Sequence, residues 1–261
     1  MLAVGMAAAY PLLAACEKKG AVATHANTSI RGISLDGAEI ELEKAAIREL
    51  GDAMTGPVML SGHPDYNGAR SIWNGMHDKR PALIALCLNN QDVSHAVTFA
   101  RERELLVAVR GGGHSWPGKS ICNDGLMIDL SQLTDVTIDT DKNRAHVGGG
   151  GFGRLNRKYG LAVDNLRSAE MITADGKIRT VNKEQDPDLF WAIGGGGGNF
   201  GVVTRFESEL HPFDRNVLSG SVVWPIEQAR DVLQFYAEWS AGLTDELYVG
   251  PAIPRHPTVF A

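Results

Sequence analysis

The sequence has little cysteine: only Cys16, Cys87 and Cys122 occur among its 261 residues. No two of them form a Cys-x-x-Cys pair, the usual signature of a structural zinc site, so we expect no zinc. Cys87 stands within an apolar run and is expected to be a small core residue. Cys122 follows in a predicted loop, where we expect a thiol without a function.

The sequence also lacks a run of basic residues, and its formal net charge is −6. Proteins that bind nucleic acids gather lysine and arginine on one surface, so we expect no nucleic-acid partner. No apolar run is long enough for an ordinary membrane-spanning helix. Hydrophobic residues make up 44% of the chain and charged residues 21%, which is typical of a globular protein.

Residues 1–15 are apolar and mostly small, and their length suits the core of a signal peptide. Leu13-Ala14-Ala15-Cys16 resembles a bacterial lipobox, in which Cys16 would be lipidated, although the usual preceding basic residues are missing. We therefore expect export to the bacterial cell envelope or periplasm, with membrane attachment through Cys16 and a tether at residues 17–30. The alternative is a disordered alanine-rich N-terminus on a cytoplasmic protein.

Glycine, in contrast, is abundant, and three of the 30 glycines follow an apolar run at residues 105–109 that predicts a buried strand. The glycines at 111–113 let the backbone turn tightly and expose N–H groups, which can form a nest for a phosphate or pyrophosphate. Arg110 precedes this nest, and His114 follows it, placed to bind or react with the ligand. From these residues alone, a plain glycine turn beside a surface histidine explains the pattern equally well.

Residues 80–109 predict a β-α-β unit. The apolar runs at 82–88 and 105–109 are typical of strands, and Asp92 is expected to cap the helix between them. A crossover helix favours parallel pairing of the two strands. The loop that carries His114 would then leave the carboxyl end of a strand, where ligand sites of α/β proteins lie.

Other elements are predicted on both sides of this unit. The apolar spacing in residues 38–50 predicts a helix that Gly51 would end. Strands are expected at 126–130, 136–139 and 144–147, with turn residues 141–143 joining the last two as an antiparallel hairpin.

The second half of the chain contains a further hairpin signal, Asp175-Gly176, between two strand-like runs. A helix is expected with Asp186 as its N-cap and Pro187 at its first position. The glycines at 194–198 then lead directly into an apolar strand at 202–206. Such a run predicts a packed turn that touches a ligand rather than a flexible linker.

Residues 148–153 fit the Gly-x-Gly-x-x-Gly fingerprint of dinucleotide-binding proteins, and Glu170 lies about 20 residues on, where an acid would bind the ribose. An NAD-binding Rossmann protein is therefore one interpretation. Gly160 and the residues at 163–165 count against it, because they would interrupt the helix that the fingerprint requires.

The sequence Arg110-Gly111-Gly112-Gly113-His114-Ser115 after a strand resembles the flavin-attachment loop of the vanillyl-alcohol oxidase/p-cresol methylhydroxylase (PCMH) superfamily. Within it, the chain is most similar to the berberine-bridge-enzyme-like FAD-linked oxidases. This resemblance implies a covalent bond between His114 and the 8α-methyl group of FAD. It also implies further cofactor contacts, namely Arg110 and the pyrophosphate-binding residues Gly111, Gly112, Gly113 and Ser115. The stretch 66–74 resembles the family's Tyr…Arg…Trp-Asn stretch ahead of the FAD domain.

Residues 194–203 resemble the family's second flavin loop, which lines the isoalloxazine and ribityl side of FAD. The contacts implied are Gly197, Gly198, Asn199, Gly201 and Val203. At 148–153 the chain departs from the family, because two glycine runs are fused and the strand–helix segment between them is missing. Gly151 and Gly153 are expected to be what remains of another pyrophosphate-binding loop. No cysteine lies at the junction, so a flavin with two covalent bonds is not expected.

The fold implied is α+β: a PCMH-type FAD-binding domain of two α/β subdomains, followed by the start of an α+β substrate domain. We expect a signal and tether segment at 1–30, a lead-in at 31–76, the FAD-binding domain at 77–213 and a truncated substrate domain at 214–261. The last segment predicts strands at 218–224 and 248–252 and, between them, a helix that Pro225 opens. The catalytic base and most substrate contacts are expected to lie outside this sequence.

The function implied is an FAD-dependent oxidase that oxidises an alcohol, sugar or amine carbon of a small-molecule substrate. Hydride would pass to a His-linked flavin, with O₂ as the expected acceptor. Two alternatives stay open: an inactive or partly folded FAD-binding fragment, and the NAD-binding Rossmann protein that uses residues 148–153.

Overall fold

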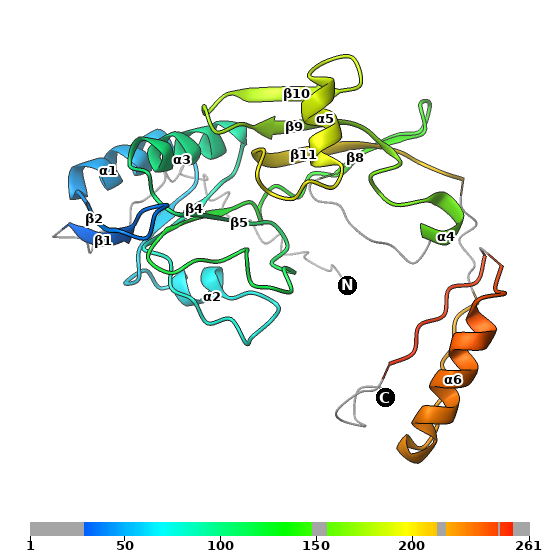
Figure 1. Cartoon of the computed structure of the whole chain (residues 1–261). Helices are drawn as coiled ribbons and strands as arrows, with labels where there is room; N and C mark the ends of the chain where they lie inside the picture. The colour runs from blue at the N-terminus through cyan, green and yellow to red at the C-terminus, as the bar shows by residue number, and fades with distance from the viewer. Residues whose placement is uncertain (1–28, 148–155, 213–217, 245, 253–261) are drawn as a thin grey trace, which may run out of the picture. The chain divides into compact units, whose positions relative to one another are not determined.

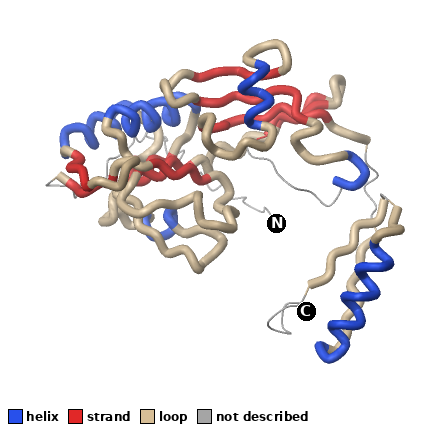
Figure 2. The backbone as a smooth tube through the Cα atoms, viewed as in Figure 1, coloured by secondary structure: helices blue, strands red, loops and turns tan. Residues whose placement is uncertain are grey.

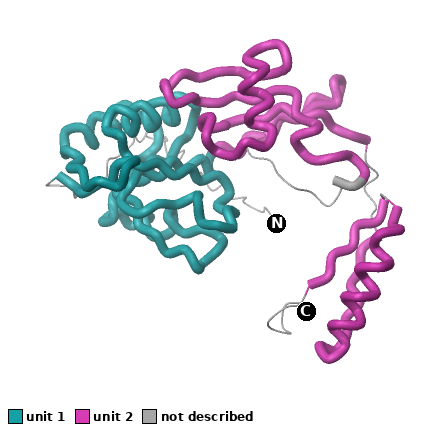
Figure 3. The backbone as a smooth tube through the Cα atoms, in the orientation of Figure 1, with its two compact units in different colours: residues 1–132 teal, residues 133–261 magenta. Residues whose placement is uncertain are grey.

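The computed structural model of the chain describes residues 29–147, 156–212, 218–244 and 246–252. The chain forms two compact units, residues 1–132 and 133–261 (Figure 3). The boundary between them falls inside the range 77–213. The predicted lipidation site Cys16 and the glycines at 148–153 lie outside the described residues.

Unit 1 is built on a four-stranded sheet in the order β3 (Val58–Met59), β4 (Leu83–Leu86), β6 (Leu126–Asp129), β5 (Val107–Arg110). In Figure 1, α1 (Lys44–Ala53) and α3 (Asn90–Glu102) lie on one face of this sheet and α2 (Tyr66–Arg70) lies on the other. The predicted strands are confirmed, but direct pairing of β4 with β5 is wrong. Each pairs in parallel with β6, which lies between them. All four residues of β6 are buried, so this strand takes a central position.

The helix that connects β4 to β5 is α3 (Asn90–Glu102), and its N-cap is not Asp92 as predicted. Asn89 is the cap, since its side-chain oxygen accepts a hydrogen bond from the N–H of Asp92 at 2.9 Å. The buried carboxylate of Asp92 instead accepts from the N–H groups of Thr55, Gly56 and Leu88, at 2.7, 3.1 and 2.9 Å. Asp92 therefore ties the loop before β3 to the start of the helix.

The predicted helix over 38–50 is partly wrong. Residues Glu39–Leu42 form β2, antiparallel to β1 (Ile30–Ile33), and the helix α1 runs over Lys44–Ala53. The alternating Glu-Ile-Glu-Leu sequence has the period of two that a strand needs. Gly51 does not end the helix, because it is buried within it.

Unit 2 is built on a five-stranded antiparallel sheet in the order β10 (Ile178–Asn182), β9 (Leu166–Ile172), β11 (Val202–Glu209), β8 (Arg144–Val147), β7 (Thr137–Asp139). The two hairpins predicted from the sequence, β7–β8 and β9–β10, are confirmed. Helix α5 (Pro187–Ile193) lies over this sheet in Figure 1. Its residues Leu189, Phe190 and Ile193 pack against a core of Ala169, Met171 and Val181. Asp186 precedes α5, but its side chain makes no capping hydrogen bond.

The sheet pairing of β8 argues against the Rossmann interpretation. A dinucleotide-binding fingerprint follows a strand of a parallel βαβ unit. Strand β8 leads into the glycines at 148–153, yet it pairs antiparallel with β7 on one side and with β11 on the other.

The remaining elements are short or little buried (Figure 2). They are α4 (Asn156–Tyr159), a 3-10 turn at Ile226–Gln228 and α6 (Ala229–Ser240), in which no residue is buried. The strands predicted at 218–224 and 248–252 are wrong, because neither range, all of it described, contains a strand. No helix in the described part of the chain is long and apolar enough to cross a membrane.

Candidate functional site

The first candidate loop begins where β5 ends, at Arg110. Arg110 pairs with Asp129 in the parallel register of β5 and β6, and its Nη1 donates to Asp129 Oδ2 at 2.8 Å. Asp129 is 1% exposed, and its other oxygen accepts from the N–H of Ser131 at 2.9 Å. A charge-assisted hydrogen bond to a buried carboxylate therefore fixes the side chain that precedes the glycines.

The glycine turn presents unused backbone donors. Within the described part of the chain, the N–H groups of residues 111–116 donate to no backbone carbonyl. Gly113 has φ +70°, which favours glycine, and a Cβ added to Gly111 would meet nothing within 4 Å. The turn therefore offers N–H groups that have no backbone acceptor among the described residues, with open space beside Gly111, and both are features of an anion-binding nest.

Arg110 adds a positive charge and a further donor beside the turn. Its Nε atom is buried and, within the described part of the chain, has no hydrogen-bond partner. A Cβ added to Gly113 would lie 3.4 Å from this nitrogen, so the guanidinium packs directly against the loop backbone.

His114 and Ser115 complete the predicted attachment loop. His114 is exposed, and its ring centroid lies 6.1 Å from that of Trp73. The hydroxyl of Ser115 accepts from the N–H of Lys119 at 3.1 Å, and its carbonyl accepts from the N–H of Gly118 at 3.1 Å. Ser115 therefore closes the turn that follows His114.

The second candidate loop connects α5 to β11 in unit 2. Gly201 has φ +145°, and a Cβ there would lie 2.5 Å from the carbonyl oxygen of Ile172, so only glycine fits. Added Cβ atoms at Gly197 and Gly198 would meet nothing within 4 Å, and Asn199 is exposed. Val203 packs against the core of unit 2, so its side chain is engaged there.

The structure gathers the predicted residues into two groups. Residues 110–115 lie together after β5, and residues 197–203 lie together before and within β11. Gly151 and Gly153 are outside the described residues. Two neighbours of the first loop had no predicted role: Asp129, a buried acid that follows an apolar strand, and Trp73, which the sequence pattern 66–74 contained.

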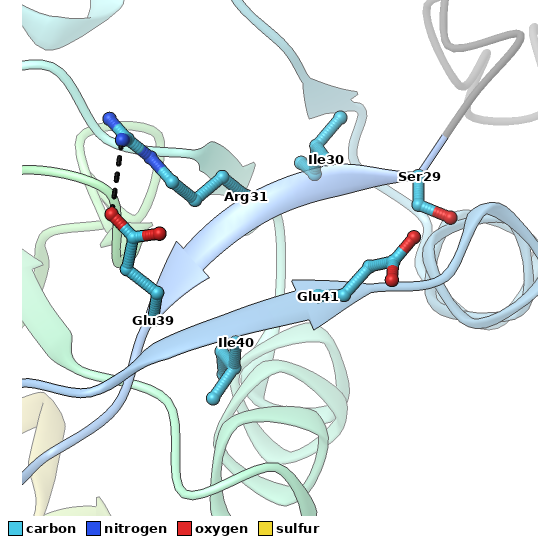
Figure 4. Close-up of a pocket in the computed structure, with 6 residues that line it drawn as sticks. All are labelled: Ser29, Ile30, Arg31, Glu39, Ile40 and Glu41. Carbon is cyan, nitrogen blue, oxygen red and sulfur yellow. Dashed lines mark hydrogen bonds and ion pairs between the residues drawn. The ribbon is translucent and has the colours of Figure 1, made fainter.

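A pocket at the β1–β2 hairpin contains none of the predicted site residues (Figure 4). It is lined by Ser29, Ile30, Arg31, Glu39, Ile40 and Glu41. Arg31 and Glu39 form an ion pair at 3.2 Å, and both side chains are more than half exposed. Within the described residues, no group of three or more histidine, cysteine, aspartate or glutamate side chains could hold a metal ion.

Both cysteines of unit 1 in the described part are buried free thiols. Burial raises the pKa of Cys122 to about 11 and raises that of Cys87 further. Cys122 therefore lies in a loop, as predicted, and its thiol is buried there.

A sequence profile of the family described as "FAD binding domain" matches residues 81–151. The chain is 33% identical over 206 residues to (R)-6-hydroxynicotine oxidase of Paenarthrobacter nicotinovorans, which covers 66% of this chain and 45% of that protein. It is 34% identical over 233 residues to an uncharacterised FAD-linked oxidoreductase of Bacillus subtilis, covering 74% of this chain and 51% of the relative. The chain thus spans about half the length of the curated relatives it matches.

Solved structures give the same result. The crystal structure of 6-hydroxy-D-nicotine oxidase from Arthrobacter nicotinovorans matches with a TM-score of 0.58 at 33% identity, over 60% of this chain and 42% of that one. The xylooligosaccharide oxidase from Myceliophthora thermophila matches with a TM-score of 0.59 at 26% identity, over 63% of this chain and 42% of that one. The mixed α+β fold predicted from the sequence is thereby confirmed.

Proposed function

The chain belongs to the FAD-linked oxidoreductases of the berberine-bridge-enzyme-like and 6-hydroxynicotine oxidase family, with a PCMH-type FAD-binding domain, and we propose that it binds FAD through the loop at 110–115. The observation that carries this proposal is the set of unused N–H groups beside a fixed guanidinium. These groups suit the two negative charges of the FAD pyrophosphate.

We further propose that His114 carries the flavin covalently through the 8α-methyl group. The imidazole is exposed at the end of the nest, so it is free to bond to a cofactor whose pyrophosphate the preceding amides hold. Bound flavin would supply a hydride acceptor that O₂ reoxidises. The chain's own residues hold the anion, orient the imidazole and keep Arg110 in place.

The second loop is proposed to contact the isoalloxazine and ribityl part of FAD. Because the side chain of Val203 packs in the core of unit 2, its contribution would come from the backbone. Gly197, Gly198 and Gly201 allow a close approach of the backbone, and Asn199 offers an exposed amide. Gly151 and Gly153 are proposed as further pyrophosphate contacts.

For the whole protein we propose oxidation of an alcohol, sugar or amine carbon of a small molecule, with O₂ as acceptor. Two similar proteins are named as a 6-hydroxynicotine oxidase and a xylooligosaccharide oxidase, which supports this range of substrates. Testing it requires assays on a full-length relative as well as on this chain.

We also propose export and lipidation at Cys16. The support is the lipobox-like sequence alone. Expression of the chain and of Cys16→Ala in bacteria, followed by membrane fractionation, tests it. Membrane attachment that Cys16→Ala abolishes supports the proposal, and equal distribution of both in the soluble fraction contradicts it.

FAD binding is tested by titrating the chain with FAD and comparing Gly111→Asp with Gly111→Asn. Both side chains have room, because an added Cβ meets nothing within 4 Å, but only aspartate places a negative charge beside the nest. We expect Gly111→Asp to weaken FAD binding by about tenfold or more, with a much smaller effect for Gly111→Asn. Equal affinity of both variants and the parent would contradict a pyrophosphate at this loop. If the parent takes up no FAD, the interpretation as an inactive fragment holds.

A further inference from the structure

Residues 66–79 are here called the strap, and three of them, Trp73, Asn74 and His77, form hydrogen bonds to the candidate attachment loop and the residues just after it. The sequence pattern in 66–74 had no assigned role. The strap begins at Tyr66, which is 1% exposed, and its hydroxyl donates to the carbonyl of Pro81 at 2.5 Å. Tyr66 packs in the cluster of Met59, Ile84, Ile121 and Met127. The strap is therefore anchored in the core of unit 1.

Arg70 closes the strap on itself. Its Nε donates to Asn67 Oδ1 at 2.9 Å, and its Nη1 donates to the carbonyl of Lys79 at 3.0 Å. Nη1 also forms an ion pair with Asp78. These bonds join the two ends of the strap and hold the residues between them in one arrangement.

The middle of the strap reaches the attachment loop through three hydrogen bonds. The N–H of Trp73 donates to the carbonyl of Gly113 at 3.1 Å. Asn74 Nδ2 donates to the carbonyl of Trp116 at 3.0 Å, and His77 Nε2 lies 3.1 Å from the same oxygen. The bonded carbonyls come immediately before His114 and two residues after it.

The indole of Trp73 lies near two other rings, those of His114 and Trp116. Its centroid is 6.1 Å from that of His114 and 5.9 Å from that of Trp116. Trp73 and Trp116 are 64% and 71% exposed, so their main contacts are with each other and the loop rather than with the core. An exposed tryptophan in this arrangement limits the positions that the imidazole can take.

We propose that Trp73 and Asn74 are positioning residues that orient His114 for attachment of the flavin. This rests on the proposed function, because it concerns the same imidazole. Among the described residues, the N–H groups at 111–116 donate to no backbone carbonyl, so the bonds from the strap to Gly113 and Trp116 are among the few that hold the loop on either side of His114. Covalent bond formation depends steeply on the placement of the reacting atoms, and loss of this restriction slows it.

The experiment compares Asn74→Asp, Trp73→Ala and Trp73→Phe in the full chain. Asn74→Asp removes the donor to Trp116 but keeps the Oδ1 that accepts from the N–H of Met76. Asn67→Asp is the matched control, since it adds the same charge to the strap and keeps the acceptor that Arg70 uses. Trp191→Ala is the control for Trp73→Ala, because Trp191 is 83% exposed and lies in α5 of unit 2.

Three quantities are measured: total bound FAD, the rate at which flavin becomes resistant to acid precipitation, and the NMR shifts of the His114 ring. We expect Asn74→Asp and Trp73→Ala to slow covalent attachment by about tenfold or more, with total FAD and melting temperature near the parent values. Trp73→Phe restores much of the rate, and both controls behave as the parent. The His114 resonances lose their ring-current shift in Trp73→Ala alone among the tryptophan variants.

Unchanged attachment rates in Asn74→Asp and Trp73→Ala overturn the proposal. Equal slowing in Asn67→Asp also overturns it, because the effect would then be one of charge. If the parent binds FAD without any covalent bond, the proposed attachment at His114 fails separately. In that case NMR alone tests whether Trp73 and Asn74 position His114. His114 resonances that are unchanged in Asn74→Asp and Trp73→Ala overturn the proposal, and altered resonances support it.

Discussion

The guanidinium of Arg110 is held at 2.8 Å by the carboxylate of Asp129, across the parallel pair β5 and β6. Asp129 is almost fully buried, and the Arg110 side chain is 18% exposed. The pair lies under the start of the loop that carries His114. If FAD binds at this loop as proposed, the stability of unit 1 and the binding of FAD depend on the same contact.

Asp129→Ala is predicted to destabilise unit 1 by about 1–3 kcal/mol, because it leaves the half-buried guanidinium of Arg110 and the N–H of Ser131 without their acceptor. Asp129→Asn keeps the shape of the side chain and one acceptor oxygen, so the free energy of unfolding falls by less. Urea unfolding of the three proteins measures both effects. A change below about 0.5 kcal/mol for Asp129→Ala would show that the pair is not buried as described.

Gly201→Ala is predicted to destabilise unit 2 by about 1–3 kcal/mol, because φ +145° is unfavourable for alanine and the added Cβ clashes with the carbonyl of Ile172. Gly198→Ala is the control in the same loop, with open space around its Cβ and no positive φ. Its cost is expected within about 0.5 kcal/mol. Equal stability of both variants in thermal unfolding would refute the backbone geometry given for Gly201.

Cys122 is predicted to resist alkylation at pH 8. Burial raises its pKa from 9.0 to about 11, and the thiolate is the reactive form. The neutral thiol stabilises the folded state below pH 9, and this contribution is lost as the pH rises through about 11. Peptide mass spectrometry after iodoacetamide treatment, with and without urea, measures the difference at Cys122 and Cys87. Rapid native labelling of either thiol would contradict the burial.

Glu207 joins three strands of unit 2 and is predicted to contribute to acid sensitivity. Ser168 Oγ donates a hydrogen bond to its carboxylate at 2.6 Å, and Arg144 Nη1 donates another at 2.7 Å. Both bonds hold the pKa of Glu207 below 4.5, and the bond from Ser168 has the larger effect. A lowered pKa stabilises the fold above pH 4.5, and the contribution is lost as the pH falls through the folded-state value.

Glu207→Gln is therefore expected to be less stable than the parent at neutral pH and to lose less stability on acidification. Unfolding measured from pH 6 to pH 3 tests this, and Ser168→Ala gives a smaller change in the same direction. Parallel acid profiles for the parent and Glu207→Gln would rule out the contribution.

Local patterns predicted strands β4, β5 and β6 of unit 1 and the hairpins of unit 2, because apolar runs and turn residues act over short distances. They did not place β6 between β4 and β5, since that order depends on which strand must be buried on both faces. The residues at 218–224 have strand-like composition but no strand partner among the described residues, and Leu218, Val222 and Val223 are exposed. A strand-like composition does not form a strand unless a neighbouring strand supplies hydrogen-bond partners.

The glycine turn after β5 could be predicted from its own residues, because the arginine, glycines and histidine are consecutive, while its role in flavin attachment is implied by the family resemblance and stays a prediction. Asp129 and Asn74 could not be, because their contacts join segments that are far apart in the chain. Because a half-buried arginine needs an acidic partner, Arg110 indicates a buried acid at the end of a neighbouring strand, and Asp129 is that acid. The sequence of the strap does not indicate its contacts with Gly113 and Trp116, because these depend on how the loop folds.

Peptide mapping of the acid-precipitated protein is the decisive test of a covalent bond between His114 and FAD. The chain is expressed with flavin available and digested, and its peptides are examined for the added mass and absorbance of FAD. We expect flavin on the peptide that contains His114 and none on the peptides of His114→Ala. Flavin on another residue, or a fully unmodified His114 peptide from protein that binds FAD, would contradict it.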